Sequence, residues 1–313
     1  MGHDTADRRT SLLIWGALVI VYVVWGSTYL AIRIAIETIP PLSSGAVRFI
    51  TAALVLGAAV WLLKGRAAFR MTGRQAGGAA LVGLLLLTGG NGMVAVAEQH
   101  ISSGLAALLV ASVPLWLVIF RVLTRDRPRV LTLAGVLIGF GGVAVLSLTG
   151  GSAAGDGTGI AVILLASLSW SVGSFLSARI PMPGDPFAAS AVEMAAGGAG
   201  LVLTALATGE RLDPAVVSGR SWAALAYLIL VGSLVGFTAY VWLLGNAPIS
   251  LVSTYAYVNP VVAVVLGALI LSEPVTGPMV AAGVVIVLGV ALVVSTERRR
   301  RPAPAPEEER AAV

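Results

Sequence analysis

The chain has 313 residues, of which 58% are apolar and only 11% are charged, and it contains 37 glycines and no cysteine. Soluble domains carry about 25% charged residues, so this composition excludes an ordinary soluble protein, and its hydrophobicity excludes intrinsic disorder. The lack of cysteine excludes disulfide frameworks, thiolate zinc sites and cysteine nucleophiles. We therefore expect a protein that crosses the membrane several times.

The chain contains ten apolar runs that are long enough to cross a bilayer, which requires about 20 residues for each helix. Continuous runs predict helices, because the strands of a membrane barrel alternate in polarity over about ten residues. Arg8 and Arg9 before the first run are compatible with an export signal. That run exceeds the length of a signal core and no small-residue cleavage site follows, so a retained helix is favoured. The ten predicted spans are 12–32, 44–63, 76–97, 101–123, 130–148, 158–178, 187–208, 221–244, 249–271 and 277–295.

The basic residues between these spans predict the orientation of the chain. With a cytoplasmic N-terminus, sixteen of the 20 Lys and Arg residues lie on the inner side, and only Arg33, Arg48, Arg211 and Arg220 lie outside. An even number of spans then places the C-terminus inside as well. The formal charge of +5 therefore indicates orientation and not nucleic-acid binding. The basic run 298–301 is expected to face anionic lipid headgroups, and the tail after it is expected to be disordered.

An internal repeat appears when the chain is shifted along itself by about 145 to 148 residues. Trp25 then pairs with Trp170, and Pro114 pairs with Pro260. This register predicts two homologous halves, residues 1–150 and 151–297, followed by a basic tail, 298–313. Each half has five spans, so the second half must enter the membrane from the opposite side. The predicted fold is all-α, with ten transmembrane helices as two inverted five-helix repeats. This arrangement is typical of secondary transporters that bind their substrate near the midplane.

Several motifs in order resemble those of the EamA family of the drug/metabolite transporter superfamily, and of its YedA-like exporter branch. The resemblance implies ten helices with both termini cytoplasmic, and export across the bacterial plasma (inner) membrane, often of amino acids or related compounds. The first-half hairpin 125–127 reads Arg-Asp-Arg where the second half has Ser272 and Glu273, so the first-half acidic position departs from the pattern. We expect Glu273 to order an outer hairpin. The motifs are WGSTY at 25–29, PPLSSGAVRF at 40–49, GNGMVAVAEQ at 90–99, STYAYVNP at 253–260 and SEP at 272–274.

Three ionisable residues, Arg48, Glu98 and Glu193, are the predicted gating or proton-coupling groups, because a charge in or beside a span is costly and often functional. Arg48 and Glu193 are equivalent in the repeat, and inversion places them at opposite ends of the bundle. Glu37 or Glu98 is the expected partner of Arg48, and Arg179 is the expected partner of Glu193. The alternative is that both side chains extend to the membrane interface. Glu193 is the prime candidate for a proton-coupling carboxylate and Glu98 the second.

Aromatic and polar side chains in the middle of spans are the predicted walls of a substrate cavity, since polar groups facing lipid would lack hydrogen bonds. Bonding between helices is the alternative role for each polar residue. Thr88 and Ser253 are further polar residues of this kind. Four tryptophans near span ends, at positions 15, 61, 222 and 242, instead fit an interfacial belt. The cavity candidates are Trp25, Asn91, Trp116, Trp170, Tyr240, Tyr255, Tyr257 and Asn259.

Two prolines within spans, Pro114 and Pro260, each free a carbonyl one turn earlier and loosen the helix there. They either permit bending during transport or form static kinks that improve packing. The glycine pairs at 135 and 139 and at 232 and 236 are expected to bring helices into close contact.

The sequence lacks the residues that an enzyme or a pump would need. The two histidines stand apart, so neither a metal site nor a histidine-based triad is supported, and no ATP-binding loop is present. We therefore expect no enzyme, no cofactor and no metal, but a secondary carrier that exports small metabolites or drugs by alternating access. Its expected partners are a small-molecule substrate and the lipid bilayer, with protons as a candidate coupling ion, in a monomer or homodimer. The alternative function is translocation of a lipid or lipid-linked headgroup.

Overall fold

The computed structural model describes residues 2–125, 128–150, 157–247, 252 and 254–298. Every regular element among them is helical, so the predicted all-α class is confirmed. The elements of the first half are α1 (Gly2–Ala35), α2 (Pro41–Lys64), η1 (Arg66–Phe69), α3 (Gly73–Gly83), η2 (Leu84–Gly92), α4 (Met93–Ala97), α5 (Ser103–Val110), α6 (Val113–Leu123) and α7 (Val130–Gly150). Those of the second half are α8 (Gly157–Ser177), α9 (Pro186–Ala207), α10 (Gly219–Tyr227), η3 (Leu228–Val235), α11 (Gly236–Asn246), α13 (Tyr255–Leu271) and α14 (Gly277–Arg298).

The helices of the described residues reproduce the predicted spans. Nine of them are long and apolar enough to cross a membrane, and α13 is a shorter apolar helix of 17 residues. The beginning of the ninth predicted span, 249–271, lies largely outside the described ranges. The polar residue predicted at position 253 also lies outside them. Three spans consist of consecutive shorter elements, namely α3 with η2 and α4, α5 with α6, and α10 with η3 and α11. The chain is thus a multi-pass membrane protein.

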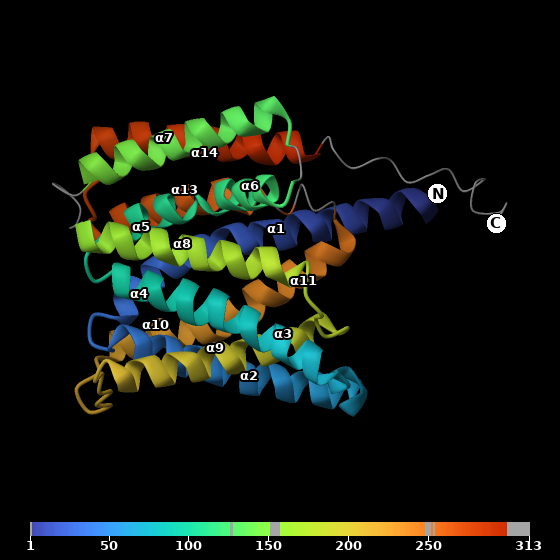
Figure 1. Ribbon diagram of the computed structural model, residues 1–313. Coiled ribbons are helices and arrows are strands. Elements are labelled where there is room, and N and C mark those ends of the chain that lie inside the picture. The colour runs from blue at the N-terminus through green and yellow to red at the C-terminus, as the bar shows by residue number, and fades with distance from the viewer. Residues whose placement is uncertain (1, 126–127, 151–156, 248–251, 253, 299–313) are drawn as a thin grey trace.

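Helices at equivalent positions of the two repeats pack side by side at the two edges of the bundle (Figure 1). The pair α2 and α9 forms one edge, and the pair α7 and α14 forms the other (Figure 1). The two members of the first pair are antiparallel, because Lys64 at the end of α2 meets Asp185 at the start of α9. Opposite directions for equivalent helices are what an inverted repeat requires. We call the side where α1 begins and α14 ends the terminal side, and the other the distal side (Figure 1).

A glycine seam holds α7 against α14. A Cβ atom on Gly135 would lie 3.0 Å from the carbonyl oxygen of Gly289, and one on Gly289 would lie 2.5 Å from the backbone nitrogen of Gly139. The two backbones therefore pack without intervening side chains, as expected for glycine pairs in membrane helices. This contact confirms the predicted role of Gly135 and Gly139.

The two prolines have different effects on their helices. The fourth span breaks between α5 and α6 at Ala111 and Ser112, just before Pro114, as predicted. Ser112 Oγ donates to the carbonyl of Leu109, 2.7 Å away, and so satisfies a group at the break. Pro260 instead lies inside the continuous helix α13. Both left-handed non-glycine residues in the described chain, Arg125 and Ser272, follow the ends of these equivalent spans.

Two π-helical segments, η2 and η3, interrupt the third and eighth spans, and the sequence patterns did not predict them. These spans are equivalents in the repeat. The wider turn of a π-helix changes which side chains face each neighbour and is frequent at functional sites. In η2, Gly89 and Gly90 lie against Ser169 and Trp170 of α8. Ser169 Oγ donates to the Leu85 carbonyl, 2.8 Å away.

Candidate transport site

Three of the predicted cavity residues form one aromatic cluster: Trp25, Tyr240 and Tyr255. The Trp25 ring centroid lies 5.0 Å from that of Tyr240 and 5.2 Å from that of Tyr255, and the two tyrosine rings are 5.9 Å apart. The rings come from α1, α11 and α13, so the cluster joins the first half to the second. Gly236 makes room for it, because a Cβ atom there would lie 2.8 Å from Trp25 Nε1.

Polar residues beside the aromatic cluster bond between α1 and the start of α13. The hydroxyls of Tyr22 and Thr254 are hydrogen-bonded to each other. The Asn259 amide, in the orientation that satisfies its surroundings, donates to the carbonyls of Tyr22 and Tyr255, each 3.2 Å away. Asn259 therefore has the interhelical bonding that was the alternative to a cavity role. Tyr257, also on α13, packs against the large hydrophobic core.

The remaining cavity candidates lie apart from the aromatic cluster. Trp116 on α6 packs edge-on against Phe140 of α7, with ring centroids 4.9 Å apart, and its buried Nε1 has no hydrogen-bond partner among the described residues. Trp170 on α8 lies against Gly90 of η2, where a Cβ atom would be 2.8 Å from its ring. Asn91 is half-buried in η2. The structure thus unites three of the eight candidates.

Arg48 is buried between α2 and η3, and its predicted ion pair was wrong. Its Nε donates to Ser233 Oγ, 2.9 Å away, and its guanidinium lies 4.7 Å from the Phe49 ring centre. In the described part of the chain no carboxylate lies within ion-pair distance of it. The predicted partner Glu37 pairs instead with Arg220, at 3.6 Å. The reason is the rotation of α2, which directs Arg48 toward η3 and not toward the loop that holds Glu37.

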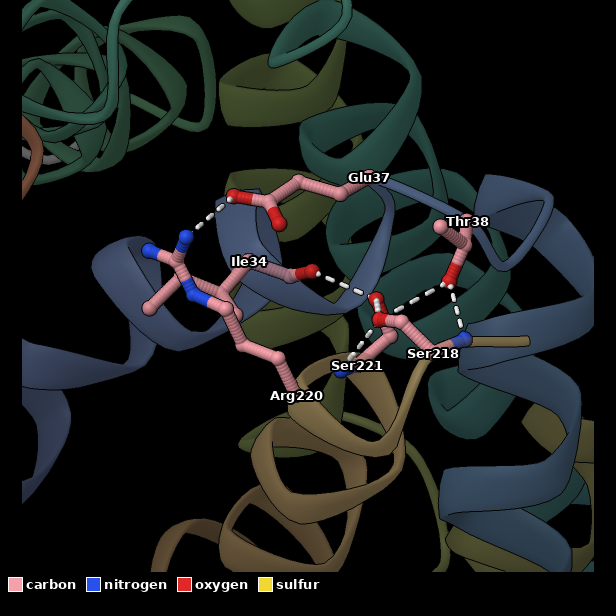
Figure 2. Close-up of polar contacts among 6 residues, drawn as sticks. All are labelled: Ile34, Glu37, Thr38, Ser218, Arg220 and Ser221. Atoms are coloured by element: carbon pink, nitrogen blue, oxygen red, sulfur yellow. Dashed lines mark hydrogen bonds and ion pairs between the residues drawn. The ribbon is translucent and has the colours of Figure 1, made fainter.

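Figure 2 shows how the end of α1 is fastened to the start of α10 on the distal side. Besides the pair of Glu37 and Arg220, Thr38 Oγ1 accepts from the Ser218 backbone N–H, 3.1 Å away. Ser221 Oγ donates to the carbonyl of Ile34, at 3.0 Å. These contacts join the two halves across the distal surface.

Two carboxylates from second-half loops cap first-half helices on the same side. Glu210 accepts hydrogen bonds from the backbone of Leu42 (3.2 Å) and Ser43 (2.9 Å) at the start of α2. Glu273 accepts from the backbone N–H groups of Ser103 (2.9 Å) and Gly104 (3.2 Å) at the start of α5, and from the Ser103 hydroxyl (3.0 Å). Negative charge at a helix N-terminus is stabilising, and each carboxylate also links the halves.

One ion pair joins the halves on the terminal side. Lys64 Nζ lies 2.5 Å from Asp185, whose carboxylate also caps α9 by accepting from the N–H groups of Phe187 and Ala188. Partial burial opposes ionisation of Asp185. The Lys64 ammonium and the two backbone donors outweigh it and hold the pKa of Asp185 below its usual value.

Glu193 has no partner in Arg179, so this predicted ion pair was also wrong. Glu193 is half-buried on α9, and its backbone faces Gly83 where α9 crosses the end of α3. The Arg179 guanidinium instead lies 3.5 Å from the Phe175 ring centre and donates to the Phe175 carbonyl, at 3.1 Å.

Glu98, the third ionisable candidate, is 0% exposed at the end of α4. Neither carboxyl oxygen has a hydrogen-bond partner among the described residues. Tyr29 and Arg33 of α1 and Glu273 lie near enough to interact with it electrostatically. Tyr29 and Arg33 were not among the residues predicted for the site, although they follow Trp25 at intervals of four residues and so share a face of α1.

A pocket of about 680 Å³ opens on the distal side beside Glu98. It lies between the ends of α1, α4 and α13. Its lining is mixed in charge, so it suits water and ions better than an apolar ligand. The lining residues are Arg33, Ile36, Glu37, Gln99, His100, Ile101, Ser102, Leu271, Ser272, Glu273 and Pro274.

Comparison with known proteins places the chain among membrane transporters. Residues 12–148 and 157–295 match the EamA-like transporter family. The chain is 43% identical over 260 residues to the uncharacterized inner membrane transporter YedA of Escherichia coli K12, covering 83% of each chain. It is 24% identical over 306 residues to the uncharacterized transporter YvbV of Bacillus subtilis, covering 97% of each. A solved crystal structure with 22% identity has the same fold, with a TM-score of 0.62 over 94% of this chain and 99% of the other.

Proposed function

The chain belongs to the EamA-like transporter family, and we propose that it is a secondary carrier that exports small amphipathic metabolites or drugs across the bacterial inner membrane. In this proposal the terminal side faces the cytoplasm, in agreement with the distribution of Lys and Arg. The aromatic cluster is the observation that carries the proposal. Its three rings come from both halves, and Trp25 lies near the middle of the first span, so a relative movement of the halves changes the site.

The chemistry of the aromatic cluster suits solutes with an apolar body and a polar group. Ring faces and edges contribute dispersion and weak electrostatic contacts without fixed hydrogen-bond geometry. The tyrosine hydroxyls and the Trp25 indole N–H offer donors to the polar group of the solute. Such contacts allow a range of solutes to bind and leave.

Alternating access requires the contacts that close each side to break in turn. On the distal side these are the carboxylate caps of Glu210 and Glu273 and the contacts of Thr38 with Ser218. On the terminal side the pair of Lys64 and Asp185 has the same role. The contacts of Thr38 with Ser218 and of Lys64 with Asp185 are exposed, so they can exchange partners for water at low cost. The Glu273 cap can open only if water reaches the buried Ser103.

Counterflow in proteoliposomes tests the proposal. Vesicles loaded with one unlabelled solute from a panel of amino acids, sugars and cationic drugs are diluted into the same solute in radiolabelled form. We expect transient accumulation of label for at least one amphipathic solute, and its loss in Trp25→Ala. Trp15→Ala is the matched control, because Trp15 is exposed at the lipid-facing start of the first span. Scrambling of labelled lipid without counterflow of any solute would instead favour the lipid translocator.

A further inference from the structure

Glu98 is completely buried, and its carboxyl group makes no hydrogen bond to any residue in the described ranges. Both oxygens are enclosed, and neither has a partner among the described residues. An ionised carboxylate in such a place loses its hydration without compensation, which costs several kcal/mol or more. In this conformation the side chain is therefore a neutral carboxylic acid that carries a proton.

The charged and titratable groups around Glu98 come from two other segments. Tyr29 and Arg33 face it from α1, and Glu273 faces it from the loop after α13. Glu37 and His100 line the adjoining pocket. Burial raises the pKa of Glu98 well above its usual range, the Glu273 charge raises it further, and Arg33 opposes both. The Glu273 carboxylate accepts three hydrogen bonds at the start of α5.

Glu98 lies between the distal pocket and the aromatic cluster. The next two residues, Gln99 and His100, line that pocket, so the chain reaches a space open to water within two residues of Glu98. In the other direction Tyr29 lies near both Glu98 and Tyr255 of the aromatic cluster. A small opening of the distal side would hydrate the carboxyl group and bring Arg33 within reach. A movement that opens the terminal side would expose Tyr29 to water from that side.

We propose that Glu98 is the proton-binding group that couples solute export to proton entry, an inference that rests on the carrier function proposed above. With the distal side open, the solute leaves and the ionised carboxylate takes a proton from the distal water. The neutral acid is then buried as the distal side closes. When the terminal side opens, the O–H bond breaks and the proton passes to water on that side, so one proton enters for each cycle that expels solute.

The test compares two modes of transport in Glu98→Gln, which is close in shape but holds no exchangeable proton. Efflux of a counterflow substrate from proteoliposomes is driven by an acidic exterior. Glu98→Gln should lose this driven efflux while counterflow stays at the wild-type rate, and Glu98→Asp should keep both. Asp213→Asn is the matched control, because Asp213 is an exposed carboxylate in the loop after α9, and it should keep both. Retention of driven efflux in Glu98→Gln, or loss of its counterflow in a protein that elutes as wild type, overturns the proposal.

Two outcomes with the wild-type protein separate this inference from the carrier function. Counterflow without any response to the pH gradient would leave the carrier and overturn the coupling. Absence of counterflow for every solute would overturn the carrier function instead. Infrared spectra give a readout that does not depend on transport. The carbonyl band of a protonated carboxylic acid should be present near neutral pH in the wild type and lost in Glu98→Gln. An unchanged band would also overturn the proposal.

Discussion

Replacement of Glu273 by alanine is expected to destabilise the protein strongly for a change at a loop residue. The carboxylate accepts two backbone hydrogen bonds and one hydroxyl hydrogen bond at the start of α5, and it also connects the halves. Ser103 is 0% exposed, so its donors have no access to water when the carboxylate is removed. The substitution therefore leaves buried donors without acceptors at the positive end of a helix.

The size of the effect follows from these three bonds. Each buried donor left without its partner costs about 1 to 3 kcal/mol, so the three together predict a loss of about 3 to 9 kcal/mol for Glu273→Ala. For a chain of this size, about 2 °C of Tm corresponds to 1 kcal/mol, which predicts a fall of about 6 to 18 °C. Glu273→Gln keeps one acceptor oxygen and should lose about half as much. Ser103→Ala removes one bond and should lose about 1 kcal/mol.

Thermal unfolding of the detergent-solubilised protein, followed by loss of the monodisperse peak in size-exclusion chromatography, measures this series. Glu37→Gln is the control, because its ion pair with Arg220 spans 3.6 Å between half-exposed side chains. Such a pair contributes at most about 1 kcal/mol. The reasoning about the cap fails if Glu273→Ala and Glu37→Gln lower Tm equally, or if Ser103→Ala is as damaging as Glu273→Ala.

Three further predictions concern helix contacts and pH. A Cβ atom on Gly83 would clash with the backbone of α9, whereas one on Gly77 meets nothing within 4 Å. Gly83→Ala should therefore lower Tm, and Gly77→Ala should raise it through a gain in helix propensity of up to about 1 kcal/mol. Equal shifts in Tm for the two variants would contradict the close crossing of α3 and α9. The raised pKa of Glu98 means that the folded state binds the extra proton, so its contribution to stability is present at low pH and lost as pH rises through the folded pKa. Between about pH 5 and about pH 9, the Tm of the wild type should therefore fall more steeply than that of Glu98→Gln. Parallel curves of Tm against pH for the two proteins would contradict a buried acid. The pKa of Asp185 is lowered, so the contribution of this residue to stability has the opposite pH dependence: it is present at neutral pH and lost as pH falls through the lowered pKa. The difference in Tm between wild type and Asp185→Asn should therefore vanish in acid. A difference that persists in acid would rule out the ionised cap.

The positions of individual residues along the membrane normal were predictable, but their partners were not. Arg48 was expected near the distal end of its span, where depth alone allows Glu37 or Glu98 as a partner. Its partner is Ser233, a residue 185 positions away on η3. Depth follows from counting residues at 1.5 Å each. The direction of a side chain around the helix axis depends on how each helix is rotated against its neighbours.

The π-helical segments show a second limit of prediction. An apolar run predicts a helix of any winding, because it specifies only that the segment avoids water. The i to i+5 bonds of η2 and η3 depend on contacts with other helices, such as the one between Ser169 and the Leu85 carbonyl. A cluster of glycines at positions 89, 90 and 92 was the available signal, and it did not specify a π-helix.

The sequence by itself determined that the chain lies in a membrane, how many times it crosses, and that it consists of two inverted halves. These features follow from the cost of burying charge in lipid and from an odd number of spans in each repeat, both of which act along the chain. The tertiary structure decided which residues meet. It grouped Trp25 with Tyr240 and Tyr255 and separated them from Trp116 and Trp170. It also left the Glu98 carboxyl group without a hydrogen bond among the residues that the structure describes. Those results depend on helix rotation and close packing, because the membrane fixes the depth of each residue but leaves its neighbours to the contacts between helices.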